Sequence, residues 1–289
     1  MTNNKLKKQI LLLGADGMLG HDLYNFLLEQ KLRVKALSFP EIDLNDNNKT
    51  EQILKSLDFD ILINCTAYTN VDACETDKKQ AYQLNATTPG ILAKLCKDKN
   101  ATIVHFSTDY VFDGKNKIAY SEFNKPKPIN YYGKSKLAGE ENIKKNTENY
   151  LIIRTAWLYG ASGNNFVKKI LSMCKEKETI KIVNDQFGSP TYTKDLSKMT
   201  WKIILSKKTG LFHVTNQGFC SWYDLANKVI ELANIPKNII PCTSNEYPTP
   251  AKRPQNSKLK NLQLIKYKIP LLRPWDRALK DCLKELSLK

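Results

Sequence analysis

The sequence predicts an α/β protein with a doubly wound parallel sheet and a smaller C-terminal lobe. Short apolar segments alternate with segments of helical periodicity over roughly the first 160 residues, as strand–helix–strand units require. Most of these segments are apolar throughout, which is typical of parallel strands buried on both faces. We therefore expect six strands, at residues 9–13, 32–37, 60–65, 101–106, 150–155 and 211–215.

Helical periodicity fills the intervals between these strands. Leu19, Leu23, Phe26 and Leu27 recur at the spacing of one helix face after the first strand. Two more helices are expected before residue 160, at 84–95 and 134–145. After residue 160 the alternation weakens, and we expect helices only at 166–171, 193–205 and 222–230. Prolines recur from Pro236 onward and predict a loop-rich tail.

Composition excludes several classes of protein. The chain has 289 residues, 42% of them hydrophobic, which suits one large domain with a smaller partner. No apolar segment approaches the roughly 18–20 residues of a membrane-spanning helix. The first apolar run ends at Gly14, so we expect a buried strand there and no secretion signal. These features predict a cytoplasmic protein without a membrane partner.

Cysteine and histidine spacing argues against a metal site. The seven cysteines are scattered without a Cys-x-x-Cys pair, and the three histidines lie far apart. A zinc site or a disulfide framework needs closer spacing, so we expect reduced thiols and no metal ligands. The sequence carries no information on a magnesium requirement.

The formal net charge of +16 raises the question of nucleic-acid binding. Only five of the 45 basic residues are arginine, although base readout and bidentate phosphate binding favour arginine. The lysines are spread along the chain and do not form a stripe with exposed aromatics. We expect no nucleic-acid partner, although a positive field attracts anionic small substrates.

A glycine-rich turn follows the first expected strand. Gly14, Gly17 and Gly20 lie between this strand and a helix. Glycines here allow a tight turn and close approach of the backbone to a pyrophosphate, and the helix N-terminus supplies amide donors. This pattern predicts a Rossmann-like dinucleotide-binding domain in which the three glycines, Met18 and Leu19 contact the cofactor.

The preference between NADPH and NADH depends on the end of the second strand. NAD-selective sites carry an acidic residue there, whereas this chain has Ser38. Asp43, a little further on, is a candidate adenine ligand. We expect NADPH, with NADH as the alternative.

Tyr132 and Lys136 are spaced as a catalytic pair. Four residues on a helix bring two side chains onto one face. An adjacent ammonium group lowers the pKa of a phenol, so we expect Tyr132 to exchange a proton near neutral pH. Tyr131 is a rival proton donor, but no lysine lies four residues after it, and Lys134 is off the Tyr132 face.

Five segments together carry a family resemblance. The glycine turn with Tyr132-x-x-x-Lys136 resembles extended short-chain dehydrogenases/reductases. Across the whole chain, the sequence resembles the dTDP-4-dehydrorhamnose reductase family of that group. The five segments are 64–72 (NCTAYTNVD), 107–114 (STDYVFDG), 132–140 (YGKSKLAGE), 184–191 (NDQFGSPT) and 253–259 (RPQNSKL).

The resemblance implies the reduction of a dTDP-linked 4-keto-6-deoxy sugar, dTDP-4-dehydro-6-deoxy-L-mannose, to dTDP-L-rhamnose in surface polysaccharide synthesis. It implies a catalytic set of Thr108, which binds the ketone, Tyr132, which gives the proton, and Lys136, which binds the nicotinamide ribose. It also implies cofactor contacts at Leu44, Ala67, Tyr68 and Thr69. Substrate contacts are implied at Thr108, Asp109, Tyr110, Trp157, Asn165 and Arg253, with the last suited to phosphate. Leu44 departs from the family, because an aromatic residue is expected there against adenine.

This reading divides the chain into two parts. Residues 1–160 form the dinucleotide-binding domain, and residues 191–216 return to it. Residues 161–190 and 217–289 form the smaller substrate-binding lobe.

Three alternatives remain at this stage. A sugar-nucleotide 4,6-dehydratase needs an acidic residue where this chain has Tyr110, so a simple reductase is favoured. A non-catalytic subunit resembling the methionine adenosyltransferase regulatory subunit is disfavoured by the presence of Thr108, Tyr132 and Lys136. A reductase of a different nucleotide ketosugar stays open as the alternative substrate, because small changes in the lobe admit a 6-deoxytalose-type or UDP-linked ketosugar. The oligomeric state is open, with a homodimer among the options.

Overall fold

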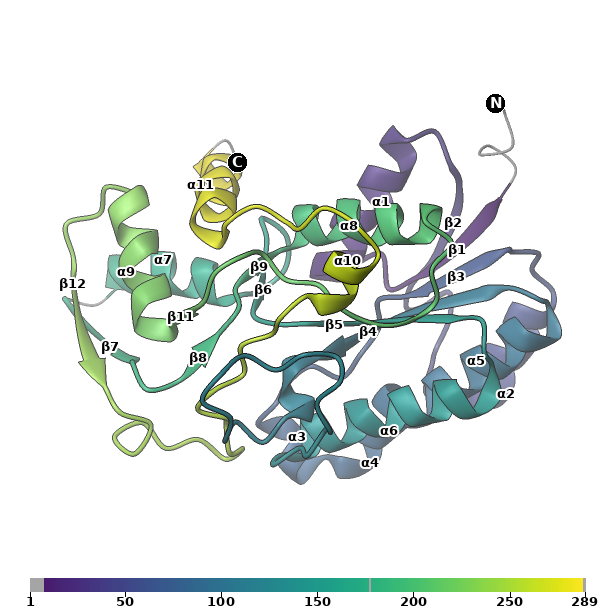
Figure 1. The fold of residues 1–289 in the computed structure, drawn as a ribbon, viewed down its shortest axis with the longest axis horizontal. Coiled ribbons are helices and arrows are strands. Elements are labelled where there is room, and N and C mark those ends of the chain that lie inside the picture. Colours follow the sequence, from purple (N-terminus) through teal and green to yellow (C-terminus); the bar gives the residue numbers. More distant parts are fainter. Residues whose placement is uncertain (1–7, 177, 288–289) are drawn as a thin grey trace.

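The fold is built on a six-stranded sheet. A computed structural model describes residues 8–176 and 178–287, and every neighbouring pair of strands in the sheet is parallel. The order β10-β5-β4-β3-β1-β2 confirms the predicted doubly wound parallel sheet (Figure 1). All six expected strands are present, and their ends differ from the expected ones by at most two residues. They are β1 (Gln9–Leu13), β2 (Arg33–Leu37), β3 (Ile61–Asn64), β4 (Thr102–Thr108), β5 (Tyr150–Thr155) and β10 (Gly210–His213).

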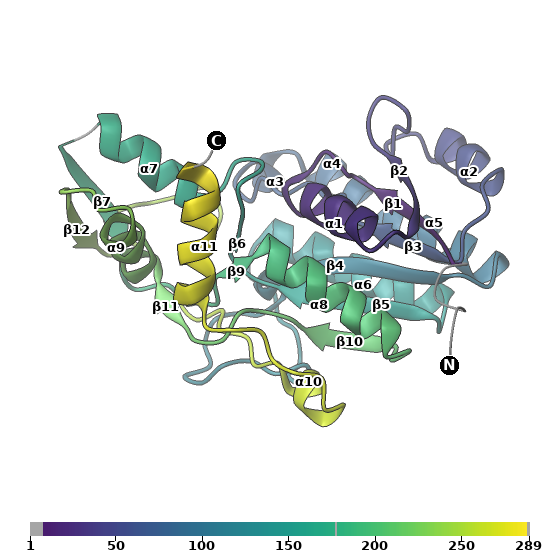
Figure 2. The same ribbon diagram turned by 90° about the horizontal axis from the view of Figure 1, so that it is seen from above.

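Helices cover both faces of this sheet (Figures 1 and 2). Ile10 and Leu12 of β1 pack in one apolar cluster, whereas Leu11 and Leu13 pack in another on the opposite face. Because successive side chains of a strand point to opposite faces, double coverage explains why these strands are apolar throughout. One face carries α1 (Met18–Glu29) and α8 (Thr193–Leu205), and the other carries α2 (Asn47–Lys55), α5 (Thr88–Asp98) and α6 (Tyr131–Asn146).

The segment between β3 and α5 contains short helical turns that the sequence did not predict. The helix expected at 84–95 is divided, because Pro89 lies in the first turn of α5, where its missing N–H is not needed. A π-helical turn at Gln83–Thr87 precedes it. The other short elements are α3 (Ala73–Thr76), α4 (Lys78–Tyr82) and, after β4, a 3₁₀ turn at Asp109–Val111.

A smaller lobe lies beyond one end of the sheet, on the left of Figure 1. Its apolar cluster includes Val167, Ile180, Val229 and Leu279, all nearly inaccessible to solvent. The expected helices here are α7 (Phe166–Glu176) and α9 (Trp222–Leu232). The short strands pair as β7 (Thr179–Val183) with β12 (Asn238–Cys242), β8 (Phe187–Gly188) with β11 (Cys220–Ser221), and β6 (Leu158–Tyr159) with β9 (Thr191–Tyr192).

The C-terminal tail is more ordered than its prolines suggest, so the prediction of a loop-rich tail is wrong for part of it. Besides β12 it holds α10 (Leu262–Lys266) and α11 (Trp275–Ser287). Leu264 and Leu272 pack in the cluster over the sheet, whereas Leu279 packs in the lobe. The tail therefore joins the two parts of the molecule. The predicted residue ranges for the two parts stay a prediction, and their ends at 1–7 and 288–289 lie outside the described residues.

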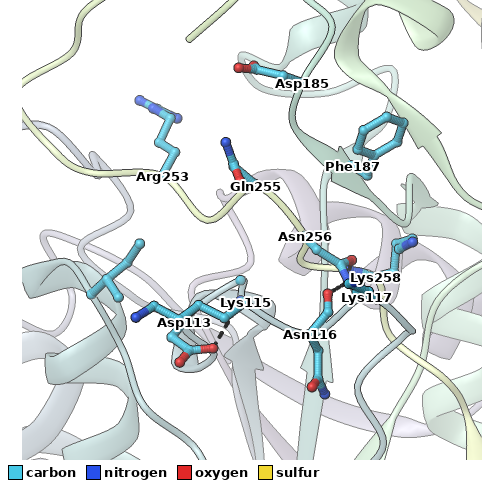
Figure 3. A pocket seen from close by; sticks show the side chains of 12 residues that line it. Asp113, Lys115, Asn116, Lys117, Asp185, Phe187, Arg253, Gln255, Asn256 and Lys258 are labelled. Carbon is cyan, nitrogen blue, oxygen red and sulfur yellow. Dashed lines mark hydrogen bonds between the residues drawn. The ribbon is translucent and has the colours of Figure 1, made fainter. Parts of the chain in front are cut away.

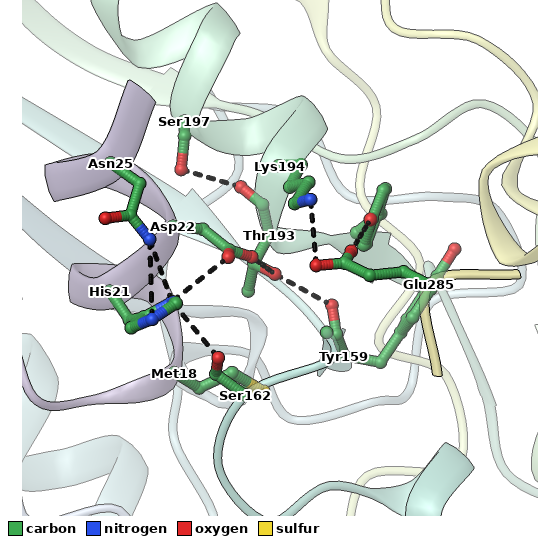
Figure 4. Close-up of polar contacts among 12 residues, drawn as sticks. Met18, His21, Asp22, Asn25, Tyr159, Ser162, Thr193, Lys194, Ser197 and Glu285 are labelled. Atoms are coloured by element: carbon green, nitrogen blue, oxygen red, sulfur yellow. Dashed lines mark hydrogen bonds and ion pairs between the residues drawn. The ribbon is translucent and has the colours of Figure 1, made fainter. Parts of the chain in front are cut away.

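Polar contacts link α1 to the segments that enter and leave the lobe (Figure 4). Asp22 of α1 is buried and accepts a hydrogen bond from the Thr193 hydroxyl at the start of α8. Next to it, the Ser162 hydroxyl lies 3.1 Å from Nδ1 of His21. These contacts hold the segments around Ser162 and Thr193, which connect the sheet and the lobe, against the N-terminal half of α1. No helix in the described ranges is long and apolar enough to cross a membrane.

Candidate active site

A cavity of about 760 Å³ lies at the carboxyl ends of the sheet strands and reaches the lobe. The strand order reverses between β1 and β3, and such a switch point is where ligands of doubly wound sheets bind. Thirteen of the residues that the sequence predicts for the site line this one cavity. They are Gly14, Gly17, Met18, Leu19, Ala67, Thr69, Thr108, Asp109, Tyr110, Tyr132, Lys136, Trp157 and Arg253.

The glycine turn has the geometry that a dinucleotide needs. Gly14 has φ +78°, and a Cβ there would lie 2.7 Å from the Thr66 side chain. A Cβ on Gly20 would lie 1.9 Å from the Gly14 carbonyl oxygen, so Gly20 allows α1 to pack against the turn. Gly17 is the N-cap of α1 and offers no side-chain acceptor to the first amides of the helix. Those amides and the helix dipole fit a pyrophosphate.

An acidic side chain lies at the end of the second strand, although the sequence predicted none. The backbone N–H of Ser38 donates to Oε2 of Glu41 at 3.3 Å, and the Ser38 hydroxyl accepts from the N–H of Asp16 in the glycine turn at 3.4 Å. Glu41 therefore adds a negative charge close to the position that Ser38 occupies. The spacing of three residues between a serine and a carboxylate was the available signal, because it is typical of local capping contacts.

Five predicted residues do not line the cavity. Leu44 is buried in the apolar cluster on the α5 side of the sheet, and the Asp43 side chain accepts hydrogen bonds from Asn45. Tyr68 directs its hydroxyl to Asp77. Gly20 contacts the Gly14 turn, as described above.

Asn165, the fifth of these residues, caps a helix. Its side-chain oxygen accepts from the N–H of Lys168 at 3.2 Å, and its amide donates to the Gly160 carbonyl at 2.8 Å. Both polar ends of this side chain are therefore engaged within the chain. Its neighbour Asn164 lines the cavity instead.

The start of α6 positions Tyr132. The Asn130 side chain caps the helix by accepting from the N–H of Gly133 at 2.8 Å. A Cβ on Gly133 would lie 2.1 Å from the Tyr110 carbonyl oxygen, so this glycine brings α6 against the turn after β4. The rings of Tyr132 and Tyr110 meet edge to face, with centroids 6.0 Å apart.

Tyr131 belongs to different surroundings. Its backbone N–H donates to Glu75 at 2.8 Å, and the ammonium of Lys78 lies 5.7 Å from the centre of its ring. It does not line the cavity. The geometry therefore favours Tyr132 over its neighbour as the group that meets a ligand.

The expected effect of Lys136 on Tyr132 is not found. The pKa of Tyr132 is raised, chiefly by burial and also by Asp109, while the Thr108 hydroxyl opposes the rise. Lys136 does not lower it, because its ammonium nitrogen is directed to the Phe106 carbonyl oxygen at 2.6 Å. A raised pKa keeps the Tyr132 phenol protonated, as a proton donor must be.

Lys136 itself is buried, with 2% of its surface exposed. Burial lowers its pKa to about 8, and Glu140 one turn further along α6 opposes this. Glu140 is held by two hydrogen bonds from Arg154, at 2.8 and 2.6 Å, and by one from Ser107 at 2.6 Å. These buried hydrogen bonds join α6 to the ends of β4 and β5 below the cavity.

Thr108 is the last residue of β4, and Asp109 begins the 3₁₀ turn that follows it. The Thr108 hydroxyl donates to Oδ1 of Asp109 at 2.9 Å and accepts from the N–H of Tyr110 at 3.1 Å. Asp109 is 3% exposed, and burial raises its pKa to about 6, against weaker opposing contacts with Ser257 and Thr108. A carboxyl group that is partly protonated near neutral pH thus lies beside the Thr108 hydroxyl.

Two stacked indoles form the wall toward the lobe. Trp157 and Trp222 are nearly parallel, with ring centroids 3.4 Å apart. A Cβ on Gly188 would lie 2.2 Å from the Trp157 ring, so the glycine is needed for this placement. The sequence predicted Trp157 but treated Trp222 only as a helix marker, since nothing in a single sequence brings α9 to residue 157.

Arg253 lies where three cavities meet. Its Nη2 is 2.9 Å from Oδ2 of Asp72, and its Nε is buried without a hydrogen-bond partner in the part of the chain that the structure describes. Figure 3 shows Arg253 at the edge of a second cavity of about 790 Å³, which also contains Asp185 and Phe187. A third cavity of about 580 Å³ extends into the lobe and is also lined by Trp222, Ile182 and Tyr247.

Comparisons with known proteins cover almost the whole chain. The profile of a family described as the RmlD substrate binding domain matches residues 8–288. The dTDP-4-dehydrorhamnose reductase of Salmonella typhimurium is 36% identical over 295 aligned positions, which cover 96% of this chain and 97% of the relative.

Two solved structures have the same fold throughout. A dTDP-4-dehydrorhamnose reductase from Clostridium acetobutylicum is 39% identical, with a TM-score of 0.94, over 96% of this chain and 99% of the other. The enzyme of the same name from Bacillus anthracis, solved in complex with NADP, is 36% identical with a TM-score of 0.94, over 97% of this chain and 100% of the other.

Proposed function

This chain belongs to the family of dTDP-4-dehydrorhamnose reductases, and we propose that it reduces the 4-keto group of dTDP-4-dehydro-6-deoxy-L-mannose to give dTDP-L-rhamnose. It is an NAD(P)H-dependent oxidoreductase of nucleotide-sugar synthesis. The observation that supports this substrate and reaction most directly is the composition of one cavity. It is lined by Gly14 and Gly17 of the glycine turn together with Thr108, Tyr132, Lys136 and Arg253.

The chemistry follows from the groups in this cavity. A bound reduced nicotinamide supplies a hydride to the ketone carbon. Tyr132 gives its proton to the ketone oxygen, and its raised pKa keeps that proton available. Lys136 binds the nicotinamide ribose through its charged amine. General acid catalysis of this kind contributes about 10²–10⁴-fold to the rate.

Thr108 orients the ketone. Its hydroxyl donates to Asp109 in the free protein, so it turns from that carboxylate to the substrate oxygen on binding. Asp109 and Tyr110 complete the sugar site beside it. A fixed ketone position over the nicotinamide reduces the entropic part of the barrier.

The dTDP group extends from the sugar toward the lobe. Arg253 binds the diphosphate, because a guanidinium group matches phosphate geometry and its Nε has no hydrogen-bond partner among the described residues. Trp157, backed by Trp222, packs against the sugar. The cavity beyond Trp222 has room for the nucleoside. Asn165 acts here only through its cap of α7.

NADPH is the proposed cofactor. NAD-selective sites carry an acidic residue at the end of the second strand, which repels a 2′-phosphate, and Ser38 stands in its place. Glu41 nevertheless brings a negative charge close to Ser38, so NADH is the alternative. The expected contacts are at the glycine turn and at Ala67 and Thr69, which line the cavity. Contacts of the cofactor with Tyr68, and of its adenine with Asp43 and Leu44, stay predictions from the sequence, because these side chains are engaged elsewhere in the free protein. All seven cysteines are unpaired, which suits the reducing cytoplasm. A homodimer stays a prediction.

A reduction assay tests this proposal. The purified chain is mixed with dTDP-4-dehydro-6-deoxy-L-mannose and either NADPH or NADH, and the absorbance of the reduced nicotinamide is followed while the product is identified by NMR. We expect absorbance loss and dTDP-L-rhamnose. Cofactor binding without absorbance loss would favour a regulatory subunit. Faster turnover of a UDP-linked or 6-deoxytalose-type ketosugar would reassign the substrate.

A further inference from the structure

Three buried polar side chains lie in a row below the cavity floor. Asn64 of β3 and His105 of β4 are register partners in the sheet. The third member of the row is Lys136 of α6, which lies next to His105. Asn64 Nδ2 is 3.2 Å from His105 Nδ1, and His105 Nε2 is 3.1 Å from Lys136 Nζ. Each residue is at most 2% exposed. Water therefore does not mediate these contacts, and the side chains must satisfy one another.

The Asn64 end of this row has one permitted orientation. Its Oδ1 accepts from the backbone N–H of Thr66 at 3.0 Å and from the Thr66 hydroxyl at 2.6 Å. A backbone N–H can only donate, so the amide oxygen must face Thr66 and the NH₂ group must face His105. Nδ1 of His105 consequently acts as an acceptor and carries no proton.

The proton of His105 must then be on its other nitrogen. Burial lowers the pKa of His105 well below its ordinary value, and Lys136 lowers it further, so the ring is neutral. A neutral imidazole has one N–H, and here it lies on Nε2, facing Lys136. The amine of Lys136 has to accept this hydrogen bond while it donates to the Phe106 carbonyl.

We infer that His105 is a positioning residue for the reaction: held as the Nε2–H tautomer by Asn64, it donates to Lys136 and stabilises the uncharged form of that amine in the free enzyme. A charged Lys136 ammonium group has no lone pair, so it cannot accept the hydrogen bond from Nε2–H of His105. Protonation of Lys136 requires the His105 proton to move to Nδ1 and the Asn64 amide to turn, with loss of the Thr66 backbone bond. The charge on Lys136 is thus coupled to Thr66, which lines the cavity.

Other titratable groups near this row do not replace His105 in that role. Tyr132 and Glu140 are on the same helix as Lys136, Asp109 follows β4, and Cys65 follows β3. Glu140, which favours charged Lys136, is committed to Arg154. Among the described residues, His105 is the titratable side chain with which Lys136 makes a hydrogen bond.

The tautomer can be measured without any assay of activity. The full chain, labelled with ¹⁵N-histidine, contains three histidines, and the His105→Gln variant assigns the His105 signals. A long-range ¹H–¹⁵N spectrum of the free protein at pH 9, above the Lys136 pKa of about 8, distinguishes the protonated from the unprotonated ring nitrogen. We expect the proton on Nε2. A proton on Nδ1, or on both nitrogens, would overturn the inference, whatever the outcome for the proposed substrate.

The pH profile tests the consequence for Lys136 and rests on the proposed function. Activity falls at high pH as Lys136 loses its charge. His105→Leu removes the donor that stabilises the uncharged amine, so this fall in kcat/KM should move to higher pH by about 0.5–1 unit. His105→Gln keeps a donor for Lys136 and should leave the fall closer to that of the wild type.

Asn64→Asp is the complementary variant. Its carboxylate can only accept, so it requires a proton on Nδ1 of His105 and leaves Nε2 as an acceptor for charged Lys136. The high-pH fall should again move upward, and the ¹⁵N spectrum should show the exchanged tautomer. A fall that moves downward in His105→Leu, or stays in place in both variants, would contradict the inference. If Asn64→Asp does not fold, the wild-type spectrum and His105→Leu still decide it.

Discussion

Arg253 and Asp72 form an ion pair at the rim of the active-site cavity, with Nη2 and Oδ2 2.9 Å apart. Asp72 also accepts from the N–H of Ala251 at 3.1 Å, so it holds both the guanidinium and the loop that carries it. Arg253 thus faces the cavity in a defined position before any anion binds, and within residues 8–176 and 178–287 its Nε has no hydrogen-bond partner. This arrangement resembles a preformed phosphate site.

Loss of the Arg253 guanidinium should weaken substrate binding selectively. A charge-assisted hydrogen bond is worth about 1.5–3 kcal/mol, so Arg253→Ala should raise KM for the dTDP-sugar about 10–100-fold. The dissociation constant for NADPH, measured by fluorescence titration, should stay near that of the wild type. Asp72→Asn is the matched control, since it removes the partner but keeps the guanidinium, and it should have the smaller effect. An unchanged KM in Arg253→Ala would remove the arginine from the substrate site.

The two adjacent tyrosines should behave differently when each loses its hydroxyl. Tyr132→Phe should reduce turnover by about 10²–10⁴-fold, because the proton donor is lost, with little change in NADPH affinity. Tyr131→Phe should retain turnover, since Tyr131 lies outside the cavity. Steady-state rates and cofactor titrations of both variants make the comparison. Equal rates for Tyr132→Phe and the wild type would exclude Tyr132 as the donor.

Alanine substitutions of the two glycines that follow Gly14 should have different effects, one on cofactor binding and the other on stability. A Cβ on Gly20 would lie 1.9 Å from the Gly14 carbonyl oxygen, whereas one on Gly17 would lie 3.4 Å from it. Gly20→Ala should therefore destabilise the fold by about 1–3 kcal/mol, as overpacking does. Gly17→Ala should fold normally and lose NADPH affinity, because the backbone can no longer approach the pyrophosphate. Urea unfolding and cofactor titration separate the two effects. Equal unfolding midpoints for both variants would contradict this account.

Local patterns in the sequence were sufficient for the sheet and most helices. The buried strands β1 and β5 and the helix α8 begin and end where apolar periodicity indicates. The helix α11 was also readable, because Ala278, Leu279 and Cys282 have helical spacing, but Pro270 and Pro274 suggested a loop. Pro274 instead precedes the first turn, where proline is tolerated.

Contacts between distant segments account for what the sequence could not predict. Asp72 and Arg253 are far apart along the chain, and nothing local pairs them. The row of Asn64, His105 and Lys136 depends on the register of β3 against β4, which periodicity alone does not set. The pKa of Tyr132 was mispredicted for the same reason, since helix spacing brings Lys136 near but does not show that its amine is directed elsewhere.

Asp109 should make the protein less stable as the pH rises. Its folded-state pKa of about 6 is above the value of about 3.9 for an exposed aspartate. Between these two values the folded state binds more protons than the unfolded state, so the free energy of unfolding falls as pH increases through this window. The loss is roughly 2–3 kcal/mol once the pH exceeds 6.

Asp109→Asn removes this titration while keeping the side-chain shape and an acceptor for Thr108. Relative to the wild type, the variant should gain stability progressively from pH 4 to pH 6.5, with a constant difference above that. Urea unfolding at pH 4.5, 5.5, 6.5 and 7.5 measures the difference. Asp58→Asn, at an exposed position, is the matched control for loss of one carboxylate. A difference between variant and wild type that does not change with pH would mean that Asp109 is ionised throughout this range, and Thr108 would then lie beside a permanent negative charge.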